Sequence, residues 1–159
     1  MPEFWLDTNS LVEPKKGPYG FDIAPGFWSF LERKIAEQVI ASSSLVLMEL
    51  KEFEDELSQW AEAHSDCFVE PNENVQAVVG QIADYVNGNY PNHHATDFLS
   101  KADPWIIAQA RVHGGKVVTF ETPVPPNSTK PKIPNVATVF GVETINIYAV
   151  VRQLGLSLR

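Results

Sequence analysis

Residues 3–10 read Glu-Phe-Trp-Leu-Asp-Thr-Asn-Ser, and this stretch decides the fold that we expect. The apolar run Phe4-Trp5-Leu6 is short, and polar residues that favour turns and helix caps follow it at once. Such a run is typical of a buried strand. We therefore predict a first strand over residues 3–6, with the Asp7 carboxylate at its carboxyl end.

Outward from this strand, short β-rich runs alternate with longer segments whose apolar residues recur at helical spacing. Further strands are predicted over 39–41, 67–69, 116–120 and 142–145. Helices are predicted over 27–38, 42–64, 74–86, 103–112, 136–140 and 147–154, with loops over 13–26, 87–94 and 122–134. This alternation is typical of a parallel sheet with helices on both faces. Because the sequence has no repeat or composition boundary, we expect one domain over residues 1–159.

The composition narrows the class of protein. The chain has 159 residues, of which 44% are apolar and 20% charged, as in an ordinary soluble globular protein. No apolar stretch approaches the ~20 residues of a membrane span, and the N-terminus lacks the pattern of a signal peptide. The single Cys67 excludes an internal disulfide and is expected to be a buried, inert thiol. We therefore expect a cytoplasmic protein with no membrane partner.

The formal net charge of −8 argues against a protein that binds nucleic acid by broad neutralisation of its phosphates. It does not exclude a nuclease, because carboxylates gathered in one pocket bind Mg²⁺ or Mn²⁺, and the metal then meets the phosphate. An acidic surface equally suits a basic partner protein. The positions of the acids have to decide between these alternatives.

Asp7 and Glu49 are the first two candidate site residues. Asp7 is expected at the edge of the sheet where ligands of such folds bind, although an Asp in this context also forms turns and caps. Glu49 falls inside the apolar arc of the helix predicted over 42–64, between Leu45 and Phe53. A carboxylate on a core-facing arc is costly unless it pairs with a base or coordinates a cation. Of these two alternatives for Glu49, we favour metal ligation.

Asp103 and Glu121 complete the set. Asp103 precedes Pro104 and is a natural N-cap for the following helix, a role compatible with ligation because a helix N-terminus keeps a carboxylate ionised. Glu121 follows the strand predicted over 116–120, and the Thr119 hydroxyl two residues earlier is placed to orient a ligand. The alternative for Glu121 is a solvated side chain.

Carboxylates from four separate segments predict a site made of oxygen ligands. Oxygen-only ligation suits Mg²⁺ or Mn²⁺ and disfavours structural zinc, for which one cysteine is inadequate. The histidines show no regular ligand spacing, and His93-His94 is expected in a solvated loop beside Pro91. The sequence also lacks a Gly-rich phosphate loop and a Gly-x-Ser-x-Gly elbow, which argues against nucleotide binding and against an α/β-hydrolase.

The candidate acids lie in four recognisable segments, and a closing stretch runs from Val139 to Ile147. These segments are Leu6-Asp7-Thr8-Asn9-Ser10-Leu11, Leu47-Met48-Glu49-Leu50, Ala102-Asp103-Pro104-Trp105-Ile106-Ile107-Ala108-Gln109-Ala110 and Val117-Val118-Thr119-Phe120-Glu121. No single motif is specific, but their order and spacing cover almost the whole chain. As an ordered set, they resemble the PIN-domain family. The resemblance implies a three-layer α/β/α sandwich around a mainly parallel sheet.

The resemblance also implies a function, namely metal-dependent hydrolysis of RNA phosphodiester bonds with Mg²⁺ or Mn²⁺ as cofactor. The expected catalytic residues and metal ligands are Asp7, Glu49, Asp103 and Glu121. The expected substrate-positioning residues are Thr119, Asn9, Lys130 and Lys132. Many bacterial members resemble toxins of toxin–antitoxin modules, so the expected partners are a small antitoxin protein and a second copy in a homodimer.

Two alternatives stay open at this point. Glu121 stands where PIN nucleases commonly carry Asp, which favours a catalytically inactive PIN-like scaffold that binds RNA or protein. The other alternative is a response-regulator-like receiver, also a parallel α/β domain with an acidic pocket. A receiver needs an Asp at the end of a middle strand and a Lys at the end of a late one. This chain has Ser42 and Asn146 there, which argues against a receiver.

Overall fold

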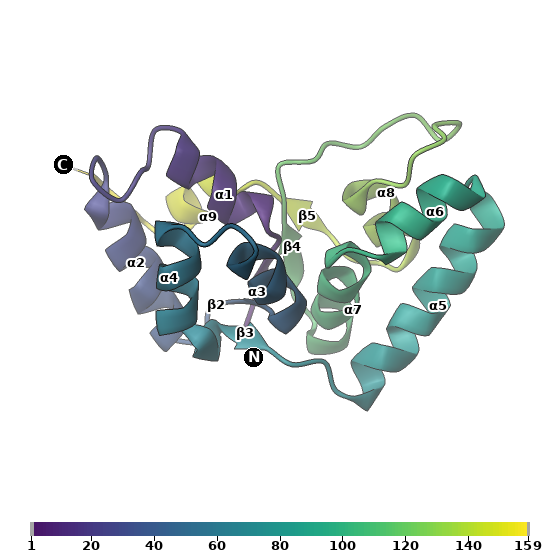
Figure 1. Ribbon diagram of the computed structural model, residues 1–159, viewed down its shortest axis with the longest axis horizontal. Coiled ribbons are helices and arrows are strands. Elements are labelled where there is room, and N and C mark those ends of the chain that lie inside the picture. The colour runs from purple at the N-terminus through teal and green to yellow at the C-terminus, as the bar shows by residue number, and fades with distance from the viewer. Residues whose placement is uncertain (1, 159) are drawn as a thin grey trace.

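A computed structural model describes residues 2–158, and it contains one five-stranded sheet between two layers of helices (Figure 1). The strand order is β3-β2-β1-β4-β5, and every neighbouring pair is parallel. The expected three-layer α/β/α fold is therefore confirmed. The strands are β1 (Phe4–Leu6), β2 (Ile40–Ser43), β3 (Phe68–Val69), β4 (Lys116–Val118) and β5 (Thr144–Ile145).

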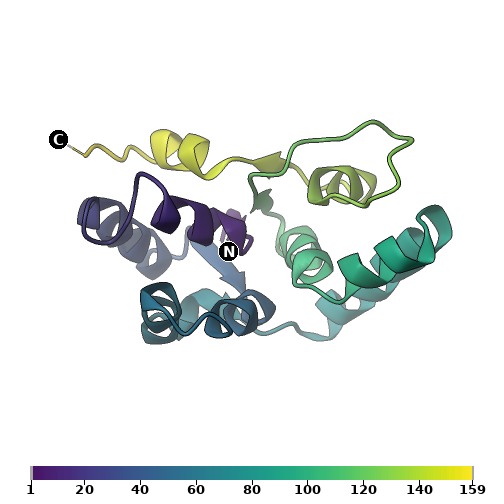
Figure 2. The ribbon, with the colours of Figure 1, turned by 45° about the horizontal axis from the view of Figure 1, so that its top comes forward.

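The helices cover both faces of the sheet (Figures 1 and 2). Strand side chains alternate between the two faces, so Phe4 and Leu6 pack into one hydrophobic core and Trp5 into the other. The first layer contains α1 (Asn9–Lys16), α2 (Pro25–Ala36), α3 (Ser44–Lys51), α4 (Glu56–Ala63) and α9 (Ile147–Gln153). The second contains α5 (Glu73–Asn89), α6 (Asn92–Leu99), α7 (Asp103–His113) and α8 (Ile133–Val139).

The strand order changes direction at β1, which makes the junction of β1 and β4 the switch point of the topology. β1 pairs with β2 on one side and β4 on the other, with Leu6 opposite Ser42 and Val118. In open parallel sheets, ligands bind outside the carboxyl ends of the strands at such a point. Asp7 follows β1 directly, and its backbone N–H donates to the Val118 carbonyl at 3.0 Å. The fold therefore brings the first predicted site residue to the switch point.

The single helix predicted over 42–64 is wrong, because the chain forms α3 and α4 there. Between them, Glu54 has a left-handed backbone with φ 47°, which ends the first helix. The Asp55 carboxylate then accepts a hydrogen bond from the Ser58 backbone N–H at 2.9 Å and caps α4. As a result Phe53, which the single-helix projection placed against the core, is 59% exposed.

Two predicted loops are wrong in part. The loop predicted over 13–26 begins only after Lys16, because α1 continues through Pro14, whose ring is buried. The turn predicted over 87–94 is mostly helical, since α5 extends into it and α6 begins directly after Pro91. Proline is well suited to this position because it lacks the N–H that the start of a helix leaves unpaired.

Two further expectations concern the cysteine and membrane spans. Cys67 is buried, as predicted, and burial raises the pKa of its thiol to about 12. Such a thiol stays protonated and unreactive near neutral pH. Within residues 2–158, no helix combines the length and the apolar character needed to cross a membrane.

Candidate functional site

Asp7 is fixed at the end of β1 by its own turn. The residue is only 5% exposed, and its Oδ1 accepts hydrogen bonds from the Ser10 backbone N–H at 2.9 Å and the Ser10 hydroxyl at 2.8 Å. That hydroxyl also lies 2.7 Å from the Val118 carbonyl oxygen, and its single proton serves one acceptor at a time. Ser10 thus ties the Asp7 carboxylate to the end of β4.

The surroundings of Asp7 disfavour its negative charge. Burial raises the pKa of Asp7 to about 6, and the negative charge of Glu121 acts in the same direction. Hydrogen bonds from the Thr119 and Ser10 side chains oppose this rise, because they stabilise the carboxylate. A cation bound nearby would favour the charged form of this carboxyl group and offset the cost of its burial.

Asp103 is the first residue of α7 and does not cap it, so its predicted N-cap role is wrong. Ala102 occupies the cap position, and no side chain of the described residues 2–158 caps the helix there. Pro104 follows Asp103 at the start of the helix, and Gly114 ends it in a left-handed conformation with φ 76°, both as predicted. The Asp103 carboxylate is therefore not occupied by capping and lies half-buried at the start of the helix.

The pKa of Asp103 is affected by all three of the other acids. Burial is the largest cause that raises the pKa of Asp103, to about 7. Repulsion by the other three acids adds to the rise, in the order Glu121, Asp7 and Glu49. The positive charge of Lys101 acts against it. The other three predicted acids therefore all lie within electrostatic reach of Asp103.

Glu49 joins three segments of the site. It is half-buried on α3, and its Oε1 accepts a hydrogen bond from the hydroxyl of Thr8, the neighbour of Asp7. Its Oε2 accepts a hydrogen bond from the Ala102 backbone N–H at 2.8 Å, directly before Asp103. No ion pair among the described residues includes Glu49, so the alternative of a salt bridge to Lys or Arg is not realised.

Glu121 lies just beyond β4 and is also half-buried. Its backbone N–H donates to the Thr119 hydroxyl at 3.1 Å, and its Oε1 accepts from the Ile133 backbone N–H at 3.0 Å. The second bond closes the Pro-rich loop onto the start of α8. One carboxylate oxygen is therefore used by the fold, so the Glu121 side chain is not wholly solvated.

Two hollows meet at Glu121. The first has a volume of about 360 Å³, and the cationic side chains along it define what we call the cationic hollow. Its lining includes Asp103, Glu121, His93, His94, Lys101, Lys130 and Lys132. The second hollow, of about 450 Å³, carries aromatic rings and the start of α1. Its lining includes Glu121, Asn9, Glu13, Phe120 and Tyr148.

These hollows place the predicted positioning residues. Lys130 and Lys132 line the first hollow with Asp103 and Glu121, and Asn9 lines the second hollow with Glu121. Thr119 is only 3% exposed, and its hydroxyl bonds to the Glu121 backbone N–H and to the Asp7 carboxylate instead of the solvent. The cationic hollow also contains His93-His94 and Lys101, which the sequence did not single out as site residues. A helix that begins after Pro91 could have been predicted from the helical spacing of the residues that follow. Such a helix, observed as α6, carries both histidines in its first turn.

The carboxylate oxygens of the four acids are suitable ligands for a hard divalent cation, although the structure does not arrange them as a metal site. Within residues 2–158, no group of three or more His, Cys, Asp or Glu side chains is placed to hold a metal ion. Both oxygens of Glu49 and one oxygen of Glu121 already accept hydrogen bonds. Oxygen donors alone are the preferred ligands of Mg²⁺ and Mn²⁺, and a cation would offset the charge that burial disfavours at Asp7 and Asp103.

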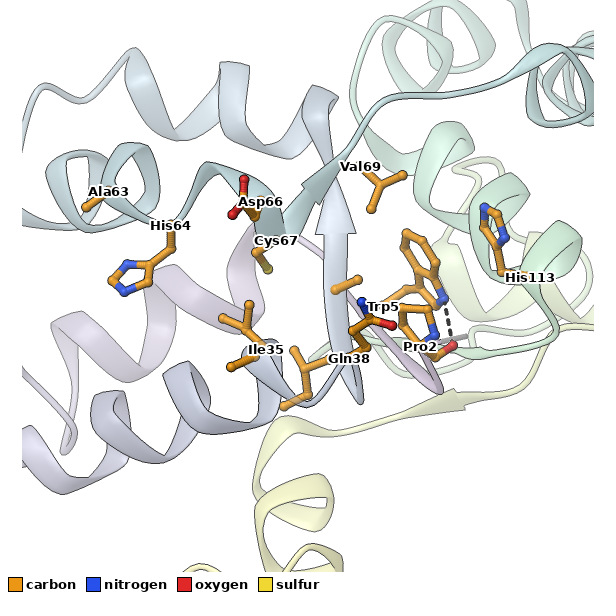
Figure 3. Close-up of a pocket in the computed structure, with 13 residues that line it drawn as sticks. Pro2, Trp5, Ile35, Gln38, Ala63, His64, Asp66, Cys67, Val69 and His113 are labelled. Carbon is orange, nitrogen blue, oxygen red and sulfur yellow. Dashed lines mark hydrogen bonds between the residues drawn. The ribbon is translucent and has the colours of Figure 1, made fainter.

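A larger hollow, of about 540 Å³, lies at the other edge of the sheet (Figure 3). It is lined by Pro2 before β1, Ile40 at the start of β2 and Cys67 before β3. One wall is the Trp5 indole, which stacks on His113 with 5.1 Å between ring centroids and donates to the Pro2 carbonyl at 3.3 Å. None of the four acids lines this hollow, so its size does not make it the candidate site.

Comparison with known proteins gives one family. No curated protein matches the chain. A family match covers residues 4–158, which include both layers of helices, all five strands and the four acids. The chain therefore belongs to the family described as "Domain of unknown function (DUF4411)".

Proposed function

We propose that this protein is a metal-dependent ribonuclease that hydrolyses RNA phosphodiester bonds at Asp7, Glu49, Asp103 and Glu121. One observation carries the proposal: four carboxylates from separate segments gather at the switch point of a parallel sheet, and two of them have raised pKa values. Perturbed carboxyl groups at a ligand-binding edge of a fold are typical of functional sites. Buried salt bridges would also perturb such groups, but no ion pair among the described residues includes any of the four.

In the proposed mechanism, Asp7, Glu49 and Asp103 hold Mg²⁺ or Mn²⁺, and Glu121 completes the site. A metal bound there supplies an activated water and stabilises the charge that develops on the phosphoryl group. The surrounding residues orient the ligands: Ser10 bonds to Asp7, while Thr8 and the Ala102 N–H bond to Glu49. Glu121 uses one oxygen to hold α8, which leaves the other to face the reacting groups.

The finer parts of the proposal follow from the resemblance to PIN domains. We propose that the chain is a PIN-like toxin of a toxin–antitoxin module, active in the cytoplasm, blocked by a small antitoxin and able to form a homodimer. The order of the acid-bearing segments along the chain supports this reading. Expression of the chain alone should then arrest growth, and co-expression of a short DNA-binding protein from a neighbouring gene should restore it. If expression of the chain alone does not affect growth, the toxin proposal is contradicted, whereas the nuclease proposal is not tested by this result.

Cleavage of RNA is the direct test. Purified protein is incubated with labelled single-stranded and structured RNAs in Mg²⁺, Mn²⁺ or EDTA, beside the Asp103→Asn variant. The proposal expects cleavage that requires metal and is lost in the variant. Cleavage that persists in EDTA, or in the variant, would assign the activity to another site or to a contaminant.

A second candidate function is an inactive PIN-like scaffold that binds RNA or protein. The observation that favours it is the engagement of Glu49 and Glu121 by N–H donors, since a structural role alone would account for both carboxylates. For a scaffold, the Asp103→Asn variant should retain the cellular effect of the parent. For a nuclease, the same variant should lose it.

A further inference from the structure

The cationic hollow concentrates positive groups in a protein that is acidic overall. The chain has 12 Lys and Arg residues against 20 Asp and Glu. Three of the lysines and a pair of histidines nevertheless line one hollow, contributed by α6, by the turn before α7 and by the Pro-rich loop. These are His93, His94, Lys101, Lys130 and Lys132. The lining also includes three acids, Asp97, Asp103 and Glu121, so its formal charge is zero with neutral histidines, against −8 for the whole chain. Lysines clustered in this way can still attract an anion.

The two loop lysines are held in place by the fold. Lys130 and Lys132 flank Pro131, which is buried and lines the hollow. At its base, the loop is closed by the bond from the Ile133 N–H to Glu121. It is also clamped by Asn135, whose side-chain amide accepts from Val124 N at 2.9 Å and donates to Val124 O at 2.8 Å.

The lysines of the hollow are only partly engaged in ion pairs. Lys101 pairs with Asp97 at 3.1 Å, but no ion pair among the described residues includes Lys130 or Lys132. The His93 and His94 rings lie 3.9 Å apart between centroids. After burial, the positive charges of His93 and Lys130 lower the pKa of His94. Like charges gathered in this way favour a bound anion that relieves their repulsion.

We propose that the cationic hollow binds a backbone phosphate of a nucleic-acid strand, next to the phosphate that lies at the four acids. The inference rests on the proposed function, because RNA is taken as the strand. The hollow and the acids share Asp103 and Glu121, so a continuous strand can occupy both. Contacts to phosphate fix the register of a strand without reading its bases. Binding at the hollow is therefore independent of sequence and weakens with salt.

The test measures binding separately from cleavage. All variants are made in the Asp103→Asn background, and the anisotropy of a short fluorescent single-stranded RNA is followed over a series of salt concentrations. Lys130→Ala/Lys132→Ala removes two charges from the hollow. The matched control, Arg33→Ala/Lys34→Ala, removes two charges from α2 in the other helical layer. A Lys130→Arg/Lys132→Arg variant keeps the charge, and melting temperatures report whether each variant is folded.

We expect the hollow variant to bind RNA roughly tenfold more weakly, with a salt dependence reduced by about one charge contact, whatever the RNA sequence. The arginine variant should bind like the parent, and the control should be unchanged. Equal effects in the hollow variant and the control, or no RNA binding by the parent, would overturn the inference. Because binding is measured without cleavage, weakened binding in the hollow variant would stand even if the wild-type protein cut no RNA. Conversely, metal-dependent cleavage with unaltered RNA binding in the hollow variant would support the nuclease proposal and contradict the proposed phosphate site.

Discussion

The Glu49 carboxylate accepts a hydrogen bond from the backbone N–H of Ala102 at 2.8 Å, across 53 residues of sequence. The next residue, Asp103, begins α7, so one bond sets the position of two candidate ligands relative to each other. The other Glu49 oxygen reaches Thr8, beside Asp7. Glu49 therefore has two roles that a substitution can separate, since it carries charge and it also accepts hydrogen bonds that hold three segments together.

The Glu49→Gln variant should keep the fold and lose the function. A glutamine oxygen can still accept from the Ala102 N–H, and its amide can donate to Thr8, so the melting temperature should change by only a few degrees. Removing one negative charge should abolish metal-dependent cleavage and weaken metal binding. Glu52→Gln, at the exposed end of the same helix, is the matched control and should behave like the wild type. Cleavage retained by Glu49→Gln would mean that Glu49 is structural only.

The pH dependence of stability should reveal the buried carboxyl groups. Asp103 has an ordinary pKa of 3.8 and a pKa of about 7 in the folded protein, so the folded state binds its proton more tightly. The resulting stabilisation is present below about pH 4 and is lost as the pH rises to about 7. In EDTA, urea unfolding should therefore give a smaller free energy at pH 7 than at pH 4 from this group, by about 2 kcal/mol after allowing for its partial exposure.

The Asp103→Asn variant isolates this effect. It should flatten the dependence of the unfolding free energy on pH over the same window, because the amide does not titrate. Asp84→Asn changes an exposed residue of α5 and should leave the dependence as in the wild type. A wild-type protein whose stability rises steadily from pH 4 to pH 7, in a way the Asp103→Asn variant does not share, would show that the Asp103 carboxylate is stabilised by the fold.

Metal should stabilise the protein near neutral pH. A divalent cation offsets the repulsion among the four acids and binds the folded state in preference to the unfolded chain. At a concentration a hundredfold above the dissociation constant, the gain is about 2.7 kcal/mol, which corresponds to a rise of roughly 5–10 °C in the melting temperature. Millimolar Mg²⁺ or Mn²⁺ in a thermal melt checks this, with Asp103→Asn as the variant that should respond weakly. No shift in the wild type would count against the metal centre.

The sequence predicts those parts of the fold that depend on local pattern. An apolar run followed by polar residues identifies the end of β1 at Leu6, whereas β4 ends at Val118, two residues before its predicted end. Parallel strands bring both ends to one edge of the sheet, near Asp7 and Glu121. Competing local signals are harder to resolve. The apolar spacing from Leu50 through Phe53 favours one continuous helix, but the cap at Asp55 and the left-handed Glu54 break it.

The candidate site is predictable only in its composition. Each acid can be identified from the sequence alone, because it lies where a buried carboxylate is costly or where ligands of such folds bind. Their connections cannot: the bonds of Glu49 to Thr8 and Ala102 span 41 and 53 residues, and no local pattern encodes them. The histidines of the cationic hollow were not predicted as site residues, because Pro91 is typical of turns and we expected a loop there. In the structure, Pro91 instead precedes the helix α6, which contains them. That the acids bind metal stays a prediction.

The Asn135 side chain offers a test of how far loop order contributes to RNA binding. Asn135→Ala removes both hydrogen bonds to Val124, which should lower the unfolding free energy by about 1 kcal/mol and loosen residues 122–132. Hydrogen exchange of these residues should speed up, and RNA binding should weaken although Asn135 itself does not line the cationic hollow. Asn127→Ala, on the exposed part of the same loop, is the control that should leave both unchanged. Faster exchange with unaltered RNA binding would mean that Lys130 and Lys132 act by charge alone and need no fixed position.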